Sequence, residues 1–313
     1  MTSSSDIWLR RFSKLIVFST LFLIFAGALV KSHEVGLSVP DWPTTYGKQM
    51  FAFPLSDMVG GIFYEHGHRI IATIVGFLTM IQAIWLGFSH HADWLKKLGF
   101  SALAVVIIQG LFGGITVLFF LPPVVSIIHG ILAQTFFIMT IIIAYSMSQE
   151  RENRIDNGMG QSIRKGALLM SGFIYIQLIL GALMRHTASG LAIPDFPTVG
   201  GMWIPTFSSE MMANINYILF DLDLDSVSKG QVIIHFIHRL GAVIVTGTIG
   251  YFYAKYGETV KANQRSKAVF ISIIVIVIIQ FSLGVLTVLS ARSPYIASFH
   301  VVTGAALLGL CTL

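Results

Sequence analysis

The sequence predicts an all-α integral membrane protein with eight transmembrane helices, arranged as two parallel-repeat four-helix bundles. Three observations lead to this prediction. Of the 313 residues, 55% are hydrophobic and only 11% are charged, whereas soluble globular domains carry roughly 25% charged residues. Apolar stretches of about 20 residues, enough to cross the hydrocarbon, recur eight times. The two halves of the chain are also similar to each other in sequence.

The apolar stretches follow one another with polar segments between them. The first is longer than the core of a signal peptide, which is usually about 7–15 residues, so we expect it to be a membrane span. The expected spans are 10–31, 61–89, 95–120, 124–147, 165–186, 231–254, 268–290 and 295–313.

Basic residues predict the orientation of these spans. If the spans alternate in direction, thirteen of the twenty Lys and Arg residues lie on one side of the membrane. Such residues are enriched on the cytoplasmic side. We therefore expect both termini in the cytoplasm of a bacterial-type inner or plasma membrane, with the long segments 32–60 and 187–230 outside. The basic residues are scattered over short loops, which favours a lipid environment over a nucleic-acid partner.

Cysteine and acidic residues argue against some kinds of metal site. The single cysteine, Cys311, allows neither an internal disulfide nor a cysteine-based metal site. The acidic run "FDLDLDS" within 187–230 lacks the glycine and the spacing of a calcium-binding loop. We expect that run to be a solvated loop.

An internal repeat relates the two halves. "GALVKSHEVGLSVPDWPT" begins at Gly27 and "GALMRHTASGLAIPDFPT" begins at Gly181, and nine of the eighteen aligned residues are identical. Four spans in each half bring both halves into the membrane from the same side, which makes the repeat parallel. The expected organisation is a first bundle at 1–147, a cytoplasmic linker at 148–164 and a second bundle at 165–313.

Two pairs of histidines recur in this repeat. His68 matches His238, and His129 matches His300. All four lie one to two turns inside the outer ends of their spans, and so at similar depth near the outer face. Facing imidazoles at equal depth are what axial haem ligation requires. Hydrogen bonding between helices is the simpler alternative, and zinc fits less well because structural zinc takes four close ligands.

Other charged residues lie near these histidines. Arginine binds carboxylates in a bidentate geometry, so basic residues at the outer face are candidates for haem propionates, although ordinary interfacial anchoring explains them equally well. The candidates are Arg69, Arg239, Lys31, Arg185 and Arg292.

The residue beside each first histidine differs between the halves. Glu65 shares a helical face with His68, and His235 takes the matching position beside His238. A carboxylate next to a haem in a dry site can accept a proton or stabilise positive charge. A salt bridge to a neighbouring arginine is the structural alternative for Glu65, and His235 is expected to act outside the iron's own ligands.

The whole pattern resembles the heme A synthase family of membrane enzymes. The resemblance rests on "EHGHR" at 65–69, "GLSVPDWPT" and "GLAIPDFPT", and it covers nearly the whole chain. It implies that a ring methyl of the substrate haem O is oxidised through an alcohol to the formyl group of haem A. It further implies haem O between His68 and His129, heme b as electron relay between His238 and His300, and Glu65 as the catalytic carboxylate. Many members carry a cysteine pair in the outer loops, which this chain lacks.

Two other functions fit the histidine pattern. A di-haem b-type electron carrier would hold two resident haems, and a haem transporter or chaperone would hold one exchangeable haem without chemistry. The difference between Glu65 and His235 favours the enzyme, because a symmetric relay has no need of it. Haem O synthase, an electron-transfer protein and a second copy of the chain are possible partners.

Overall fold

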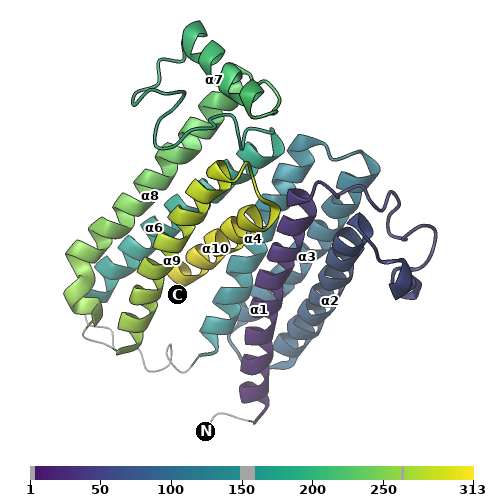
Figure 1. Cartoon of the computed structure of the whole chain (residues 1–313). Coiled ribbons are helices and arrows are strands. Elements are labelled where there is room, and N and C mark those ends of the chain that lie inside the picture. Colours follow the sequence, from purple (N-terminus) through teal and green to yellow (C-terminus); the bar gives the residue numbers. More distant parts are fainter. Residues whose placement is uncertain (1–3, 149–158, 262–263) are drawn as a thin grey trace. The chain divides into compact units, whose positions relative to one another are not determined.

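The computed structural model describes residues 4–148, 159–261 and 264–313, most of which are helical (Figure 1). Within these ranges eight helices are long and apolar enough to cross a membrane, which confirms the predicted all-α membrane fold. The only strand-like pairings there are two isolated bridges, Thr45 with Lys48 and Val199 with Met202. The chain forms two compact units, residues 1–164 with 311–313, and residues 165–310.

The first unit is a ring of four helices, each packed on the next and the last on the first. Gly99 shows how closely two of them approach, because a Cβ there would lie only 2.8 Å from Leu86 of the neighbouring helix. Such close packing, rather than expulsion from water, is what holds helices together in lipid. The helices are α1 (Ser4–Ser32), α2 (Gly61–Phe88), α3 (Asp93–Leu118) and α4 (Pro123–Ser146), with short helices η1 (Met50–Ala52) and η2 (Leu55–Asp57) in the loop between α1 and α2.

The second unit contains four long helices and one short one. α8 packs on α9 through Phe252 and Phe270, whose ring centroids lie 6.4 Å apart. Phe252 also packs against Gly166 of α6. Gly304 of α10 faces Leu178 of α6. The elements are α6 (Met159–His186), α7 (Ser209–Asp221), α8 (Lys229–Lys261), α9 (Gln264–Leu289) and α10 (Pro294–Thr312).

The helix α7 lies within the long segment predicted at 187–230, just before the acidic run that the sequence predicted to be a solvated loop. Ser208 caps it by accepting a hydrogen bond from the amide of Met211. Met211, Ile215 and Leu219 form a fully buried stripe at a spacing of four residues, and they pack in one cluster with Val232 of α8. The acidic residues that follow are exposed. The helix was missed because it is too short for a span and has only this one apolar stripe.

Helix ends differ from the predicted spans where polar residues continue a helix. α8 runs to Lys261, beyond the predicted end at 254, because backbone hydrogen bonds can continue a helix into residues that are not apolar. Likewise α6 begins at Met159, inside the predicted linker 148–164. The rest of that linker, residues 149–158, lies outside the described residues.

Candidate functional site

The second unit brings His238 of α8 and His300 of α10 together. Their ring centroids lie 6.5 Å apart with the ring planes at 79°. Imidazole nitrogens on opposite sides of one first-row metal ion, at about 2 Å each, place the ring centroids roughly 6–7 Å apart. A Cβ added at Gly181 or Gly284 would lie 3.3 or 3.1 Å from the Cε1 atom of His238 or His300. These glycines give the two rings room in a geometry that fits axial ligands of one haem iron.

The first unit also brings His68 of α2 and His129 of α4 near each other. A Cβ added at Gly27 of α1 would lie 2.9 Å from Cε1 of His68, and one at Gly113 of α3 would lie 3.5 Å from Cε1 of His129. Each imidazole therefore packs against a glycine at the matching position of the repeat.

A backbone carbonyl selects the ring tautomer of His300. Nδ1 of His300 lies 3.1 Å from the carbonyl oxygen of Gln280. A ring that donates from Nδ1 leaves the lone pair of Nε2 free to bind iron. This is the arrangement that ligating histidines adopt in metalloproteins.

The two pairs fit haem better than a bare metal ion. No group of three or more His, Cys, Asp or Glu residues able to hold a metal ion occurs in the part of the chain that the structure describes. Structural zinc takes four such ligands. Two axial imidazoles suffice when the ring of a haem supplies the remaining bonds to iron.

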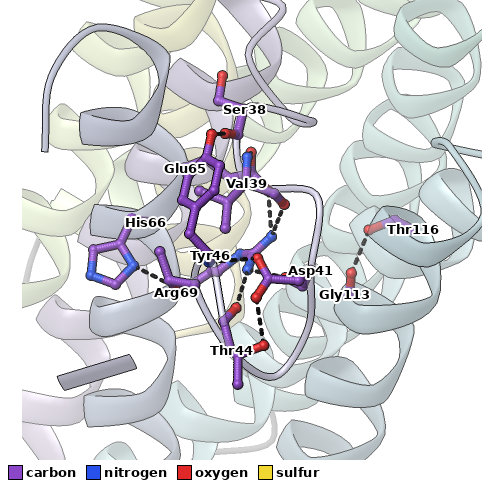
Figure 2. Close-up of polar contacts among 11 residues, drawn as sticks. Ser38, Val39, Asp41, Thr44, Tyr46, Glu65, His66, Arg69, Gly113 and Thr116 are labelled. Carbon is purple, nitrogen blue, oxygen red and sulfur yellow. Dashed lines mark hydrogen bonds and ion pairs between the residues drawn. The ribbon is translucent and has the colours of Figure 1, made fainter. Parts of the chain in front are cut away.

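Glu65 and Arg69 hold the loop between α1 and α2 against the start of α2 (Figure 2). Nη2 of Arg69 donates to Oε1 of Glu65 at 2.6 Å and to the carbonyl of Val39 at 2.6 Å. Nη1 donates to the carbonyls of Asp41, at 2.6 Å, and Thr44, at 3.2 Å. Oε2 of Glu65 accepts from the amide of Val39 at 2.8 Å. This network, which we call the first clasp, pairs two buried opposite charges.

His235 and Arg239 form the second clasp in the other unit. Arg239 donates to the carbonyls of Ile193, Asp195 and Thr198, at 2.8–3.0 Å. The amide of Ile193 lies 3.1 Å from Nδ1 of His235, and Nε of Arg239 lies 3.2 Å from Nε2. A neutral imidazole accepts at only one nitrogen. His235 therefore satisfies one of these donors at a time, whereas Glu65 satisfies both of its donors.

A carboxylate closes the turn of each outer loop. Burial acts to raise the pKa of Asp41, but hydrogen bonds from the Gly47 amide, the Thr44 hydroxyl and the Tyr46 amide outweigh it and hold that pKa below its ordinary value. Asp195 makes the same kind of turn, and its pKa is lowered in the same way against the effect of burial.

His66 supports the first loop rather than the histidine pair. Its Nδ1 lies 2.9 Å from the hydroxyl of Thr45, and its ring centroid lies 5.0 Å from that of Phe53. His66 is fully buried, so this contact fixes the loop at a further point.

The predicted propionate-binding residues fall into two groups. Arg69 and Arg239 direct their donors to loop carbonyls, as described above. Arg185 of α6 lies near Arg292, in the turn between α9 and α10, and near His300 of the second histidine pair. Lys31 lies in the last turn of α1, at the position that Arg185 takes in α6.

The sequence analysis did not predict the role of two glutamines that lie beside the histidine pairs. The amide of Gln109 donates to the backbone carbonyl of His129 at 2.8 Å, and Gln280 contacts both His300 and the hydroxyl of Thr303. The recurrence of Gln109 and Gln280 in apolar stretches was the available signal, because a buried amide needs partners.

Comparison with known proteins decides the family. A family model described as "COX15-CtaA: Cytochrome oxidase assembly protein" matches residues 10–312. The chain belongs to this family. Its relatives include the heme A synthases of Halalkalibacterium halodurans, 24% identical over 93% of this chain and 91% of the relative, and of Shewanella oneidensis, 27% identical over 98% and 94%. The heme A synthase of Lysinibacillus sphaericus is 25% identical over 97% and 92%. The predicted membership of the heme A synthase family and the prediction of a membrane enzyme are confirmed.

Proposed function

We propose that this member of the heme A synthase family oxidises a ring methyl of haem O, through an alcohol, to the formyl group of haem A. The names of the relatives support haem A as the product. The observation that carries the proposal is the pair His238 and His300, with centroids 6.5 Å apart, together with the matching pair His68 and His129.

The two units take different haems in this proposal. His68 and His129 bind haem O, and His238 and His300 hold a resident b-type haem. Bound haem supplies iron-centred oxidation and electron transfer. The chain supplies the axial imidazoles, and the carbonyl of Gln280 holds His300 in the tautomer that leaves Nε2 available.

Glu65 is the residue that we propose acts on the substrate. It shares a helical face with His68, and the first clasp pairs it with the guanidinium of Arg69. A carboxylate offers about four acceptor positions. Arg69 and the Val39 amide use two of them, and a remaining position can accept a proton or stabilise positive charge as the methyl is oxidised.

Charge suggests where the propionates lie. We propose that Arg185 and Arg292 bind the propionates in the second unit and that Lys31 contributes in the first, because Arg69 and Arg239 are bonded to loop carbonyls. Both sites then lie near the outer face of the membrane, with both termini in the cytoplasm. The basic residues of the cytoplasmic loops support this orientation.

Pigment analysis of the purified protein tests the proposal. Acid-acetone extraction and mass spectrometry should find haem B together with haem O, its hydroxylated form or haem A. His300→Ala and His238→Ala should remove the low-spin b-type absorbance, whereas His90→Ala, at an exposed loop position, should leave it intact. Unchanged haem content and spectra in both His300→Ala and His238→Ala would overturn the proposal.

A di-haem electron carrier is the second candidate, because one observation favours it. Glu65 and His235 make equivalent contacts with their loops, so their difference alone does not prove that one of them is catalytic. The carrier should contain two equivalents of haem B, and cells supplying haem O should yield no haem A. A transporter should contain one exchangeable haem and no oxidised product.

A further inference from the structure

We infer that Gln177 is a positioning residue for His238 and that it helps the second unit to retain its haem. The inference rests on the proposed haem between His238 and His300. Nε2 of Gln177 lies 3.2 Å from Nδ1 of His238 and donates to the backbone carbonyl of the same residue at 2.8 Å. Oε1 of this amide is buried, and it accepts no hydrogen bond from the described residues.

A glycine makes room for this amide. A Cβ added at Gly241 of α8 would overlap Oε1 of Gln177. No other residue type at 241 leaves that space, so Gln177 and Gly241 work as a pair. The pair brings an amide from α6 to the Nδ1 side of the imidazole.

The first unit has an apolar pair in the same place. Leu23 occupies the repeat position of Gln177, and Ile71 occupies that of Gly241. Both pack against the buried core of the first unit. Nδ1 of His68 is buried, and it has no hydrogen-bond partner among the described residues. The change from amide and glycine to leucine and isoleucine thus removes a polar partner from one axial histidine.

The amide beside His238, which His68 lacks, should change how firmly the second unit binds its haem. A histidine that binds iron through Nε2 carries a proton on Nδ1, and an acceptor for that proton fixes the ring and raises its basicity. In the orientation seen here, Nε2 of Gln177 donates to the His238 carbonyl and faces Nδ1. When the haem is bound, the amide must turn so that Oε1 accepts the Nδ1 proton, and it then gives up its bond to that carbonyl. Leu23 can neither donate nor accept. The second unit is therefore built to hold its haem and to favour ferric iron, while the first can release a product.

The test compares haem retention and reduction potential in the full-length protein. Gln177→Leu should keep its fold but lose haem B 10- to 100-fold more readily to excess apomyoglobin, the range measured when such partners are removed. A tenfold weaker preference for ferric iron should raise the potential of the haem B by about 59 mV, the one-electron equivalent. Gln177→Glu, a stronger acceptor, should keep the haem and lower that potential.

Two controls separate this inference from the proposed function. Gln82→Leu removes a buried amide bonded to Ser13 in the first unit, and it should change neither quantity. The reciprocal double variant Leu23→Gln with Ile71→Gly should increase the fraction of haem O or haem A that copurifies. If Gln177→Leu and Gln177→Glu both leave retention and potential unchanged while His238→Ala removes the haem, the inference fails and the proposed function stands. If His238→Ala keeps the haem, the proposed function itself fails.

Discussion

The first clasp joins a carboxylate to an arginine, and the second joins a neutral imidazole to an arginine, yet the two loops have the same form. Arg69 and Arg239 bind carbonyls at matching loop positions, and both loops contain a cis X-Pro bond and a turn closed by an aspartate. Since the second loop adopts this form without a carboxylate in its clasp, the form does not require Glu65. The negative charge in the first unit is therefore available for another use, and catalysis on the substrate haem is the use that we propose.

The largest effect, a loss of haem A formation, should come from replacing Glu65 with the histidine that takes its place in the second clasp. Glu65→His copies the second clasp and removes the basic carboxylate, so the protein should fold, retain haem B and bind haem O. Formation of haem A should fall by about 10²- to 10⁴-fold, the usual contribution of a general base. Glu65→Gln should behave similarly. Haem A would be measured by pigment extraction from cells that supply haem O, and near-normal amounts would show that Glu65 only holds the loop.

Replacing Arg69 or Arg239 with alanine should destabilise the protein to different extents, because the two clasps hold different partners. Arg69→Ala leaves the buried charge of Glu65 unpaired, which typically costs about 3–5 kcal/mol. Arg239→Ala leaves a neutral His235, and the loss is limited to hydrogen bonds from a charged group, about 1.5–3 kcal/mol. Thermal unfolding in detergent should rank Arg69→Ala as the less stable variant. Adding Glu65→Gln to Arg69→Ala should recover part of the loss, and the absence of any recovery would contradict this account of the first clasp.

Alanine substitutions at the glycines beside the histidines should reduce haem binding more where less space surrounds the glycine. Gly27→Ala places a Cβ 2.9 Å from His68, whereas Gly113→Ala places one 3.5 Å from His129, which is ordinary contact. We therefore expect Gly27→Ala to lower copurifying haem O and Gly113→Ala to change it little. Gly67→Ala, with nothing within 4 Å, should keep haem and gain about 0.5–1 kcal/mol from helix propensity. Equal haem losses in all three variants would refute the ranking.

The sequence predicted the features that depend on the type and spacing of side chains, namely the membrane spans and the histidine pairs. The eight apolar stretches predicted the spans, and the repeat drew attention to the pairs His68 with His129 and His238 with His300 because imidazoles are rare in apolar helices. It predicted the ion pair of Glu65 with a neighbouring arginine only as an alternative, and it did not predict the loop partners of Arg69 and Arg239. Those partners are backbone carbonyls, which every residue carries and which no residue type marks.

Positions that break the repeat were also hidden from the sequence. Gln177 has no glutamine counterpart in the first unit, so nothing in the repeat marked it, and its meaning depends on the space left by Gly241. Helix α7 has no counterpart either. Repeats reveal what two units share, whereas the features that separate their functions appear only when side chains are placed in three dimensions.

The smallest effect should come from the aspartates that close the loops. The pKa of Asp41 lies below its ordinary value of 3.8, so its contribution to stability is complete above about pH 4 and is lost as the pH falls through the lowered value. The protection of the Tyr46 and Gly47 amides, both of which donate to Asp41, should fall over that range. Hydrogen exchange, expressed as protection factors, measures this change.

Asn at either position keeps the acceptor oxygen and removes the charge. Asp41→Asn should lower protection by about 1 kcal/mol near neutral pH, the difference between charged and neutral hydrogen bonds, and should abolish the change below pH 4. Asp195 has partners at the equivalent positions of its loop and a pKa lowered in the same direction, so Asp195→Asn should give a matching result at Gly200 and Gly201. A response at one loop only would mean that the two turns are held differently. The charge of Glu65 would then no longer be the main difference between the loops, and the comparison of the two loops would no longer single out Glu65 for catalysis.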